Sequence, residues 1–148
     1  MTVRVQREDF DVGSELAGLR ERNPQVGAVA AFVGSVRDHN DGHSVVRMTL
    51  EHYPGMTEKA IAGICRVAGE RWELCDTLVI HRYGELEPCD QIVLVAVSSA
   101  HRHAAFAACE FIMDYVKTQA PLWKKETGAQ GERWVEARDS DDQAAARW

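Results

Sequence analysis

Residues 117 to 126 have the sequence Lys117-Thr118-Gln119-Ala120-Pro121-Leu122-Trp123-Lys124-Lys125-Glu126. This stretch follows the longest helical pattern of the chain, and Pro121 ends that helix because proline disfavours helical geometry at the residue before it. The residues after the proline have the pattern of a strand. Lys117 and Lys124 therefore do not lie on one continuous helix, so a turn from helix into strand, or the association of two chains, must bring them together.

The hydrophobic pattern on either side of this stretch predicts a single α+β domain with a mixed or antiparallel sheet, because hairpins interrupt any simple parallel winding. Three segments are predicted as helices, and the second and third have apolar residues at three- and four-residue steps. They are residues 14–22, 57–72 and 101–117, with Ser14, Thr57 and either Ser98 or Ser99 at their starts. Seven segments have the composition of strands. They are residues 3–5, 25–36, 45–53, 77–83, 91–98, 122–126 and 133–137.

Glycines and turn residues mark the irregular places in this pattern. We expect close backbone approach or a bulge at Gly27 and Gly34, because glycine is a weak strand former. Asp41-Gly42 is a strong turn signal, but residues 37–43 are long and polar for a plain hairpin connection. The predicted domain spans residues 1–138, and residues 139–148 form a polar tail that either frays or docks on a partner.

Composition limits the class of protein and its ligands. The 148 residues suffice for one domain with a core, and the net charge of −6 disfavours binding to nucleic acid or a membrane surface. We find no secretory or membrane segment, and the four cysteines have no C-x-x-C pairing. This cysteine spacing indicates free thiols in a reducing cytosol rather than a zinc site. We therefore expect a cytoplasmic protein with no metal and no cofactor.

The lysines are the first candidates for chemistry. If Lys117 and Lys124 converge, each ammonium disfavours the charge of the other, and one of the two has a lowered pKa. Such a lysine can act as an acid, a base or a nucleophile near neutral pH. The alternative is a helix C-terminus that favours a cation for dipole reasons, followed by a solvated strand.

His101-Arg102-His103 is the second candidate, at the start of the longest helix. Helix N-termini bind anions through free backbone N–H groups, and Arg102 adds a clamp for phosphate or carboxylate. The alternative is a pair of histidines that face solvent. The residues alone thus support an anion pocket without a metal, built from Arg37, Arg102, Lys117, Lys124 and Lys125.

Six blocks of sequence make the chain resemble a known family. They are Phe32-Val33-Gly34-Ser35-Val36-Arg37, Leu50-Glu51-His52-Tyr53, Ile80-His81-Arg82-Tyr83-Gly84-Glu85-Leu86, Ser99-Ala100-His101-Arg102, Ile112-Met113-Asp114-Tyr115-Val116-Lys117 and Ala120-Pro121-Leu122-Trp123-Lys124-Lys125-Glu126. Their order and spacing are similar to those of the large, catalytic subunit of molybdopterin synthase. The resemblance extends to about Arg138.

This resemblance implies an α/β hammerhead fold with two main helices, and a homodimer that carries a small subunit at each end as a heterotetramer. The small subunit is ubiquitin-like and ends in a Gly-Gly thiocarboxylate. The family uses this sulfur twice to convert cyclic pyranopterin monophosphate into molybdopterin, whose dithiolene later holds molybdenum. None of the four cysteines is then needed as a sulfur carrier.

The resemblance also implies which residues form the site. Lys117 and Lys124 match the catalytic lysines, which would orient the thiocarboxylate and shuttle protons; alternatively, Lys117 forms a transient covalent link to the partner's acyl group. The positions that match substrate-binding segments are Ser35, Val36, Arg37, His101, Arg102, Lys125, Glu126 and Arg138. One departure is Cys89, where relatives often have glycine in a turn.

Two other functions remain open from the sequence. One is a lyase or aldolase that forms a Schiff base on Lys117 or Lys124. The other is a module without catalytic activity that binds an anion or a ubiquitin-like tail.

Overall fold

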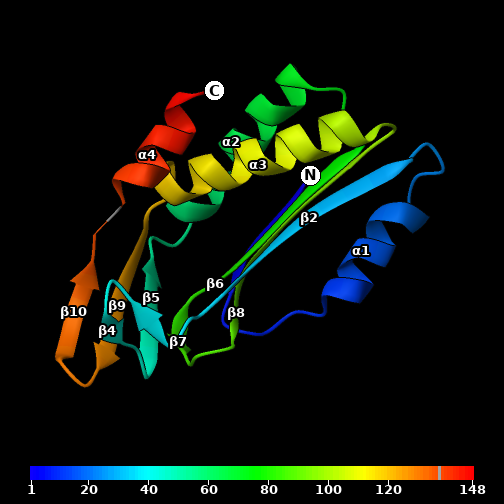
Figure 1. The fold of residues 1–148 in the computed structure, drawn as a ribbon. Helices are drawn as coiled ribbons and strands as arrows, with labels where there is room; N and C mark the ends of the chain where they lie inside the picture. The colour runs from blue at the N-terminus through cyan, green and yellow to red at the C-terminus, as the bar shows by residue number, and fades with distance from the viewer. Residues whose placement is uncertain (137) are drawn as a thin grey trace.

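The computed structural model describes residues 1–136 and 138–148, and it confirms a single α+β domain (Figure 1). The first sheet has the strand order β1-β6-β8-β2, formed by Thr2–Gln6, Asp76–Arg82, Gln91–Ser99 and Ala28–Ser35. In this sheet β1 is parallel to β6, and the other neighbours are antiparallel. The second sheet is antiparallel, with the order β10-β9-β5-β7, formed by Gly131–Val135, Leu122–Gly128, Arg47–His52 and Gly84–Leu86.

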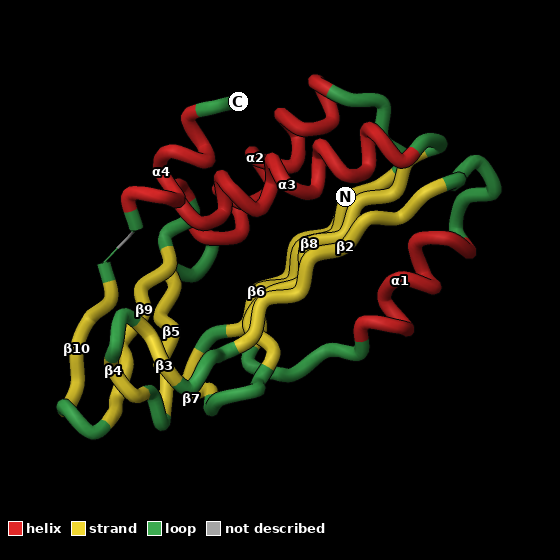
Figure 2. The backbone as a smooth tube through the Cα atoms, in the orientation of Figure 1, coloured by secondary structure: helices red, strands yellow, loops and turns green. Residues whose placement is uncertain are grey.

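The helices enclose the first sheet from both faces. Helices α2 (Met56–Arg71) and α3 (Arg102–Gln119) cover one face, and α1 (Val12–Glu21) covers the other (Figure 2). Strand β8 is buried along nearly its whole length, which explains its continuous apolar sequence. Its alternate residues pack on the two faces: Val93, Val95 and Val97 belong to the larger core cluster, whereas Leu94 and Ala96 belong to the cluster beneath α1.

The predicted break at Pro121 is confirmed. Helix α3 ends at Gln119, and Ala120 has the extended geometry of φ −75° and ψ 132° that a following proline requires. Strand β9 begins immediately at Leu122. The buried hydroxyl of Thr57 donates a hydrogen bond to the carbonyl of Pro121 at 2.9 Å and accepts one from the Tyr53 N–H at 2.9 Å. The turn from helix into strand is thus tied to the end of β5.

The predicted helix starts were wrong by small amounts. The carboxylate of Asp11, not Ser14, caps α1 by accepting a hydrogen bond from the Ser14 N–H at 2.8 Å. Helix α3 begins after His101, and neither Ser98 nor Ser99 is its cap, because both belong to β8. The residue types that favour an N-cap are short and polar, and several of them lie near each predicted helix start, so the sequence alone does not single out the cap.

The segment of residues 37–43 was predicted as a long loop, but it contains a hairpin. Strands β3 (His39–Asn40) and β4 (His43–Ser44) pair across the predicted Asp41-Gly42 turn. Both turn residues have positive φ, 50° and 77°, as a two-residue hairpin turn requires. The segment is polar because the hairpin is short and largely exposed, so few of its side chains enter the core.

The predicted irregularities at two glycines are confirmed. A Cβ on Gly27 would lie 2.3 Å from the Ala100 carbonyl oxygen, so the backbones approach closely there. The register of β2 against β8 shifts between Gly34 and Ser35, which is a bulge.

The C-terminal residues form more structure than the sequence predicted. The predicted last strand ends at Val135, and Ala137 lies outside the described residues. Beyond it, Asp139–Ala146 form helix α4, which packs alongside α3 (Figure 1). Among the described residues, no helix has the length and apolar character needed to cross a bilayer.

Candidate active site

A cavity of about 400 Å³ lies where the two sheets meet beneath the C-terminal end of α3. Strands β2, β6, β8 and β9 contribute to its wall, together with α3, the β3–β4 hairpin and the start of α4. Its charged and polar lining consists of Ser35, Arg37, His39, Asn40, His81, Lys117, Lys124, Glu126, Glu136, Arg138 and Asp141. Both predicted lysines therefore line the same cavity.

Three neighbouring strands place Gly34, Val93 and His81 in one row of the cavity wall. Gly34 is paired with Val93, and Val93 with His81, so the three residues share a face of the first sheet. A Cβ on Gly34 would lie 2.9 Å from Val93 Cγ1. Val93 thus packs directly against the backbone of Gly34, where a side chain would not fit without a shift.

His81 was not predicted as a site residue. Its side chain is 5% exposed, and its Nδ1 lies 2.9 Å from the Arg82 carbonyl oxygen. Nδ1 must carry the proton to donate this bond, so Nε2 is an acceptor. Burial, with a smaller contribution from the charges of Lys124 and Lys117, lowers the pKa of His81 to about 4. The imidazole is therefore neutral at pH 7. The feature of the sequence that could have identified this residue is a lone histidine within a predicted core strand.

The two lysines reach the cavity from different elements. Lys117 lies in the last turn of α3 and is exposed, whereas Lys124 lies in β9 and is partly buried. Burial lowers the pKa of Lys124, and the Lys117 ammonium lowers it further, while the carboxylates of Asp141 and Glu126 raise it. The prediction that one of the two lysines has a lowered pKa is thereby confirmed. Lys124 is the member of the pair suited to exchange a proton.

Glu126 and Arg138 join a polar network at one side of the cavity. Glu126 is 4% exposed and accepts hydrogen bonds from Asn40 Nδ2 at 2.7 Å and Arg133 Nη2 at 3.3 Å. The Asn40 side-chain oxygen in turn accepts a hydrogen bond from Arg138 Nη2. This network fixes the β3–β4 hairpin against β9 and holds Arg138 at the cavity.

Two further predicted residues lie outside the cavity. Lys125 points to the other face of β9, where its Nζ lies 5.7 Å from the Trp134 ring centroid and 3.9 Å from Glu132. Val36 is buried, and its N–H donates to the Asp90 carbonyl at 2.9 Å. Lys125 thus adds charge near the site without lining it, and Val36 supports the backbone before Arg37.

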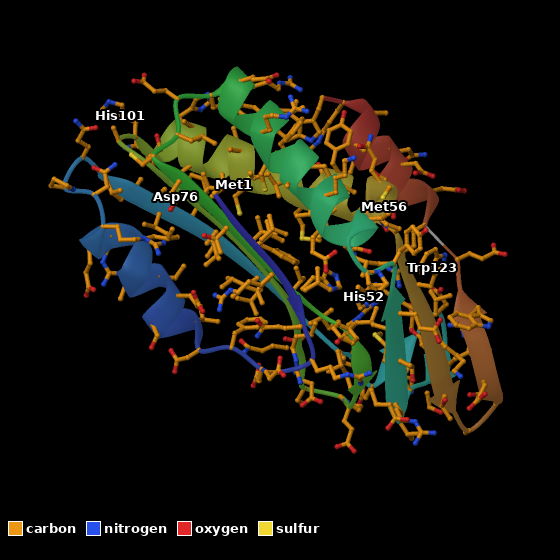
Figure 3. The ribbon with its side chains drawn as sticks, turned by 180° about the vertical axis from the view of Figure 1, so that it is seen from behind. Met1, His52, Met56, Asp76, His101 and Trp123 are labelled. Atoms are coloured by element: carbon orange, nitrogen blue, oxygen red, sulfur yellow. The ribbon has the colours of Figure 1, made fainter. Side chains whose placement is uncertain are left out.

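His101 and Arg102 are not brought to this cavity within one chain. Both are exposed at the N-terminal end of α3, where Arg102 lies fifteen residues before Lys117. At 1.5 Å per residue this separation is about 22 Å along the helix axis. Figure 3 shows His101 at the opposite end of the molecule from Trp123, the neighbour of Lys124.

None of the four cysteines, all of them within the described residues, lines this cavity. Burial raises the pKa of the Cys65 and Cys109 thiols to about 11. Cys109 packs in the core with its Sγ 3.6 Å from the Val95 carbonyl oxygen, as predicted for a small apolar residue. Within residues 1–136 and 138–148 no group of three or more histidine, cysteine or acidic side chains is arranged to hold a metal ion.

Comparison with known proteins identifies the family. The family model described as "MoaE protein" matches residues 5–119. The chain belongs to the MoaE family. A molybdopterin synthase catalytic subunit from Ralstonia nicotianae is 65% identical over 147 residues, covering 99% of this chain and 84% of the relative.

Solved structures agree with this membership of the MoaE family. A molybdopterin biosynthesis MoaE protein from Burkholderia ambifaria has 58% identity and a TM-score of 0.86, covering 99% of this chain and 97% of its own. Molybdopterin synthase from Staphylococcus aureus has 34% identity and a TM-score of 0.82, and the match covers 90% of this chain and 96% of the chain in that structure. The resemblance to molybdopterin synthase catalytic subunits, and the expectation of an enzyme, are confirmed.

Proposed function

We propose that this chain transfers sulfur to cyclic pyranopterin monophosphate as the catalytic subunit of a molybdopterin synthase. The sulfur comes from the C-terminal thiocarboxylate of a small ubiquitin-like subunit. The observation that carries the proposal is the cavity in which Lys117 and Lys124 meet beside Arg37 and Arg138. This cavity holds several cations, which can bind two anionic ligands, and one lysine whose pKa is lowered.

The lysines divide the chemistry according to their surroundings. Exposed Lys117 stays at the mouth of the cavity, where its ammonium orients the incoming thiocarboxylate. Lys124 lies deeper and gives up its proton more readily, so it exchanges protons with the pterin side chain as sulfur attacks. A transient amide between Lys117 and the partner's terminal acyl group is the alternative role for that residue.

The phosphate is held by arginines, because a guanidinium matches phosphate oxygens with two parallel hydrogen bonds. Arg37 and Arg138 come from the same chain as the lysines. We propose that His101 and Arg102 of a second copy complete this part of the site. The distance between the two ends of α3 supports this division, since one chain cannot supply both ends to one cavity.

A homodimer that meets along β2 would achieve this arrangement. Strand β2 is an edge of the first sheet, and it exposes Phe32 and Val33. Phe106, near the N-terminal end of α3, is 66% exposed. Two copies related by a two-fold axis along these edges would run antiparallel. The N-terminal end of one α3 would then lie near the C-terminal end of the other, with a small subunit docking at each outer end.

The test mixes the protein with a thiocarboxylated small subunit and cyclic pyranopterin monophosphate. Dithiolene formation is the expected result, and its absence from a folded complex would overturn the proposal. Lys117→Ala should nearly abolish product while the partner still binds. The matched control is Lys59→Ala, an exposed lysine on α2 outside this cavity. Borohydride trapping of a small carbonyl compound, without any small subunit, would instead favour a Schiff-base lyase.

A further inference from the structure

The last residue of the chain, Trp148, is anchored on the surface of α2 and α3. Its ring lies edge-on against Trp72 and Phe111, each with a centroid distance of 5.7 Å. Its indole Nε1 donates a hydrogen bond to Asp114 Oδ2 at 2.7 Å, and its carbonyl oxygen accepts one from Arg71 Nη1 at 3.1 Å. A terminal residue held by two aromatic contacts and two hydrogen bonds is not a frayed end.

Neighbouring residues extend this anchor. Arg147 bonds Glu110 and Asp114 on α3, the latter at 3.2 Å, and Ala145 is 9% exposed. Asp114 thus accepts hydrogen bonds from two successive C-terminal residues. These contacts fix the end of α4 to the outer surface of α3.

Helix α4 needs this anchor to hold its position. It has eight residues, whereas isolated helices shorter than about 12 residues are marginal in water. Its sequence is polar except for three alanines, and Ala145 is its one buried residue. The helix therefore gains little from its own apolar face, and hydrogen bonds from Arg147 and Trp148 attach its C-terminal end to α3.

The other end of α4 reaches the lysine cavity. Arg138, the residue before the helix, and Asp141 in its first turn both line that cavity. Arg138 bonds Asn40 and lies 3.8 Å from Asp41, both on the β3–β4 hairpin. Eight residues at 1.5 Å each span about 12 Å, so one short helix connects the anchored terminus with the cavity wall.

We propose that Trp148 is a positioning residue for sulfur transfer: its docking on Trp72, Phe111 and Asp114 fixes α4 and so holds Arg138 and Asp141 at the lysine cavity. The proposal rests on the function proposed above. It gives the polar C-terminal segment a role within its own chain. Trp148 itself touches neither lysine and acts only through the placement of α4.

Loss of the anchor has a specific electrostatic consequence at Lys124. The groups facing this lysine are Lys117, Asp141, Arg138, Glu126 and His81. Of the two that α4 carries, Asp141 raises the pKa of Lys124 more than Arg138 lowers it. If α4 detaches, Asp141 leaves Lys124, which lowers the pKa of this lysine, while the greater exposure of Lys124 raises it. The limb of the pH–rate profile that reports Lys124 therefore depends on the attachment of α4.

The experiment compares Trp148→Ala with wild type in the full complex with the thiocarboxylated small subunit. We expect kcat/KM for the pterin to fall about tenfold, the size of one lost charge-assisted hydrogen bond. The Lys124 limb should shift from its wild-type pH, and amide exchange should accelerate in residues 139–146 but not in α3. Trp148→Phe keeps the ring packing and loses the Nε1 donor, so its kcat/KM should lie between that of Trp148→Ala and that of wild type. Trp134→Ala removes an exposed tryptophan outside the cavity and is the matched control.

A double-mutant comparison separates positioning from general destabilisation. In a background of Arg138→Ala with Asp141→Asn, adding Trp148→Ala should cause no further loss of kcat/KM, because the groups it positions are already gone. A full additional loss in that background would overturn the proposal. So would a Trp148→Ala complex with wild-type kcat/KM, pH profile and amide exchange. If wild type itself forms no dithiolene, the proposed function fails, while the exchange measurement still reports whether Trp148 anchors α4.

Discussion

The two ends of α3 carry cationic residues in opposite surroundings. At the N-terminal end, His101 and Arg102 are exposed and do not line the lysine cavity. At the C-terminal end, Lys117 opens into a cavity that β9, the β3–β4 hairpin and α4 close around it. The same kind of side chain is therefore a surface charge at one end and part of an enclosed site at the other. Enclosure, not the cationic residue type, is what alters the pKa of Lys124.

The largest expected effect is at the enclosed end. Lys117→Ala should lower the rate of dithiolene formation on the order of 10³-fold, because it removes the positioned cation that orients the thiocarboxylate. The free energy of unfolding should change by less than about 0.5 kcal/mol, since the side chain is exposed. Single-turnover assays and urea unfolding measure the two quantities. A large loss of stability would instead make Lys117 a structural residue.

His81 makes the enclosed end sensitive to acid. Its pKa is about 4 in the folded protein against 6.5 unfolded. The unfolded state then binds more protons between these values, so stability falls as the pH drops from 6.5 to 4. The loss amounts to about 3 kcal/mol. Urea unfolding at a series of pH values should show this slope in wild type. His81→Gln should flatten it, and an equal slope in the variant would contradict the assignment.

A mixed-dimer experiment tests whether the exposed end of α3 serves the cavity of a second copy. Arg102→Ala should lower activity about 10- to 100-fold, the range for a lost hydrogen bond to a charged group. Mixing the Lys117→Ala and Arg102→Ala proteins should restore about a quarter of wild-type activity, because half of the dimers then contain one intact site. No restoration after subunit exchange would mean that Arg102 does not act across a dimer.

The smallest expected effect concerns a turn next to the enclosed end. Cys89 has a φ of 77°, and its N–H donates to the Val36 carbonyl at 2.9 Å, one residue before Arg37. Cys89→Gly should raise the free energy of unfolding by about 0.5–1 kcal/mol, because glycine adopts this geometry without a Cβ clash. Cys89→Ala keeps the Cβ and should give no gain. Thermal unfolding resolves the difference.

Local signals account for the parts of the fold that were predicted correctly. Pro121 ends α3, the Asp41-Gly42 turn has the required positive φ values, and Gly27 permits the approach of Ala100. Each depends on a backbone preference of the residue itself. Helix α4 was missed because its sequence has few apolar residues, and its attachment depends on Trp72 and Phe111, which lie far away in the sequence.

The sequence by itself determined the order of the main helices and strands up to β10, the break between Lys117 and Lys124, and the membership of the family. Only the tertiary structure decided which of the predicted cations share a cavity. It buried His81, moved Lys125 to the other face of β9, and separated Arg102 from Lys117 by the length of α3. The physical reason is that helix and turn preferences act over a few residues. The pKa of a lysine and the closure of a cavity depend instead on contacts between segments distant in the chain.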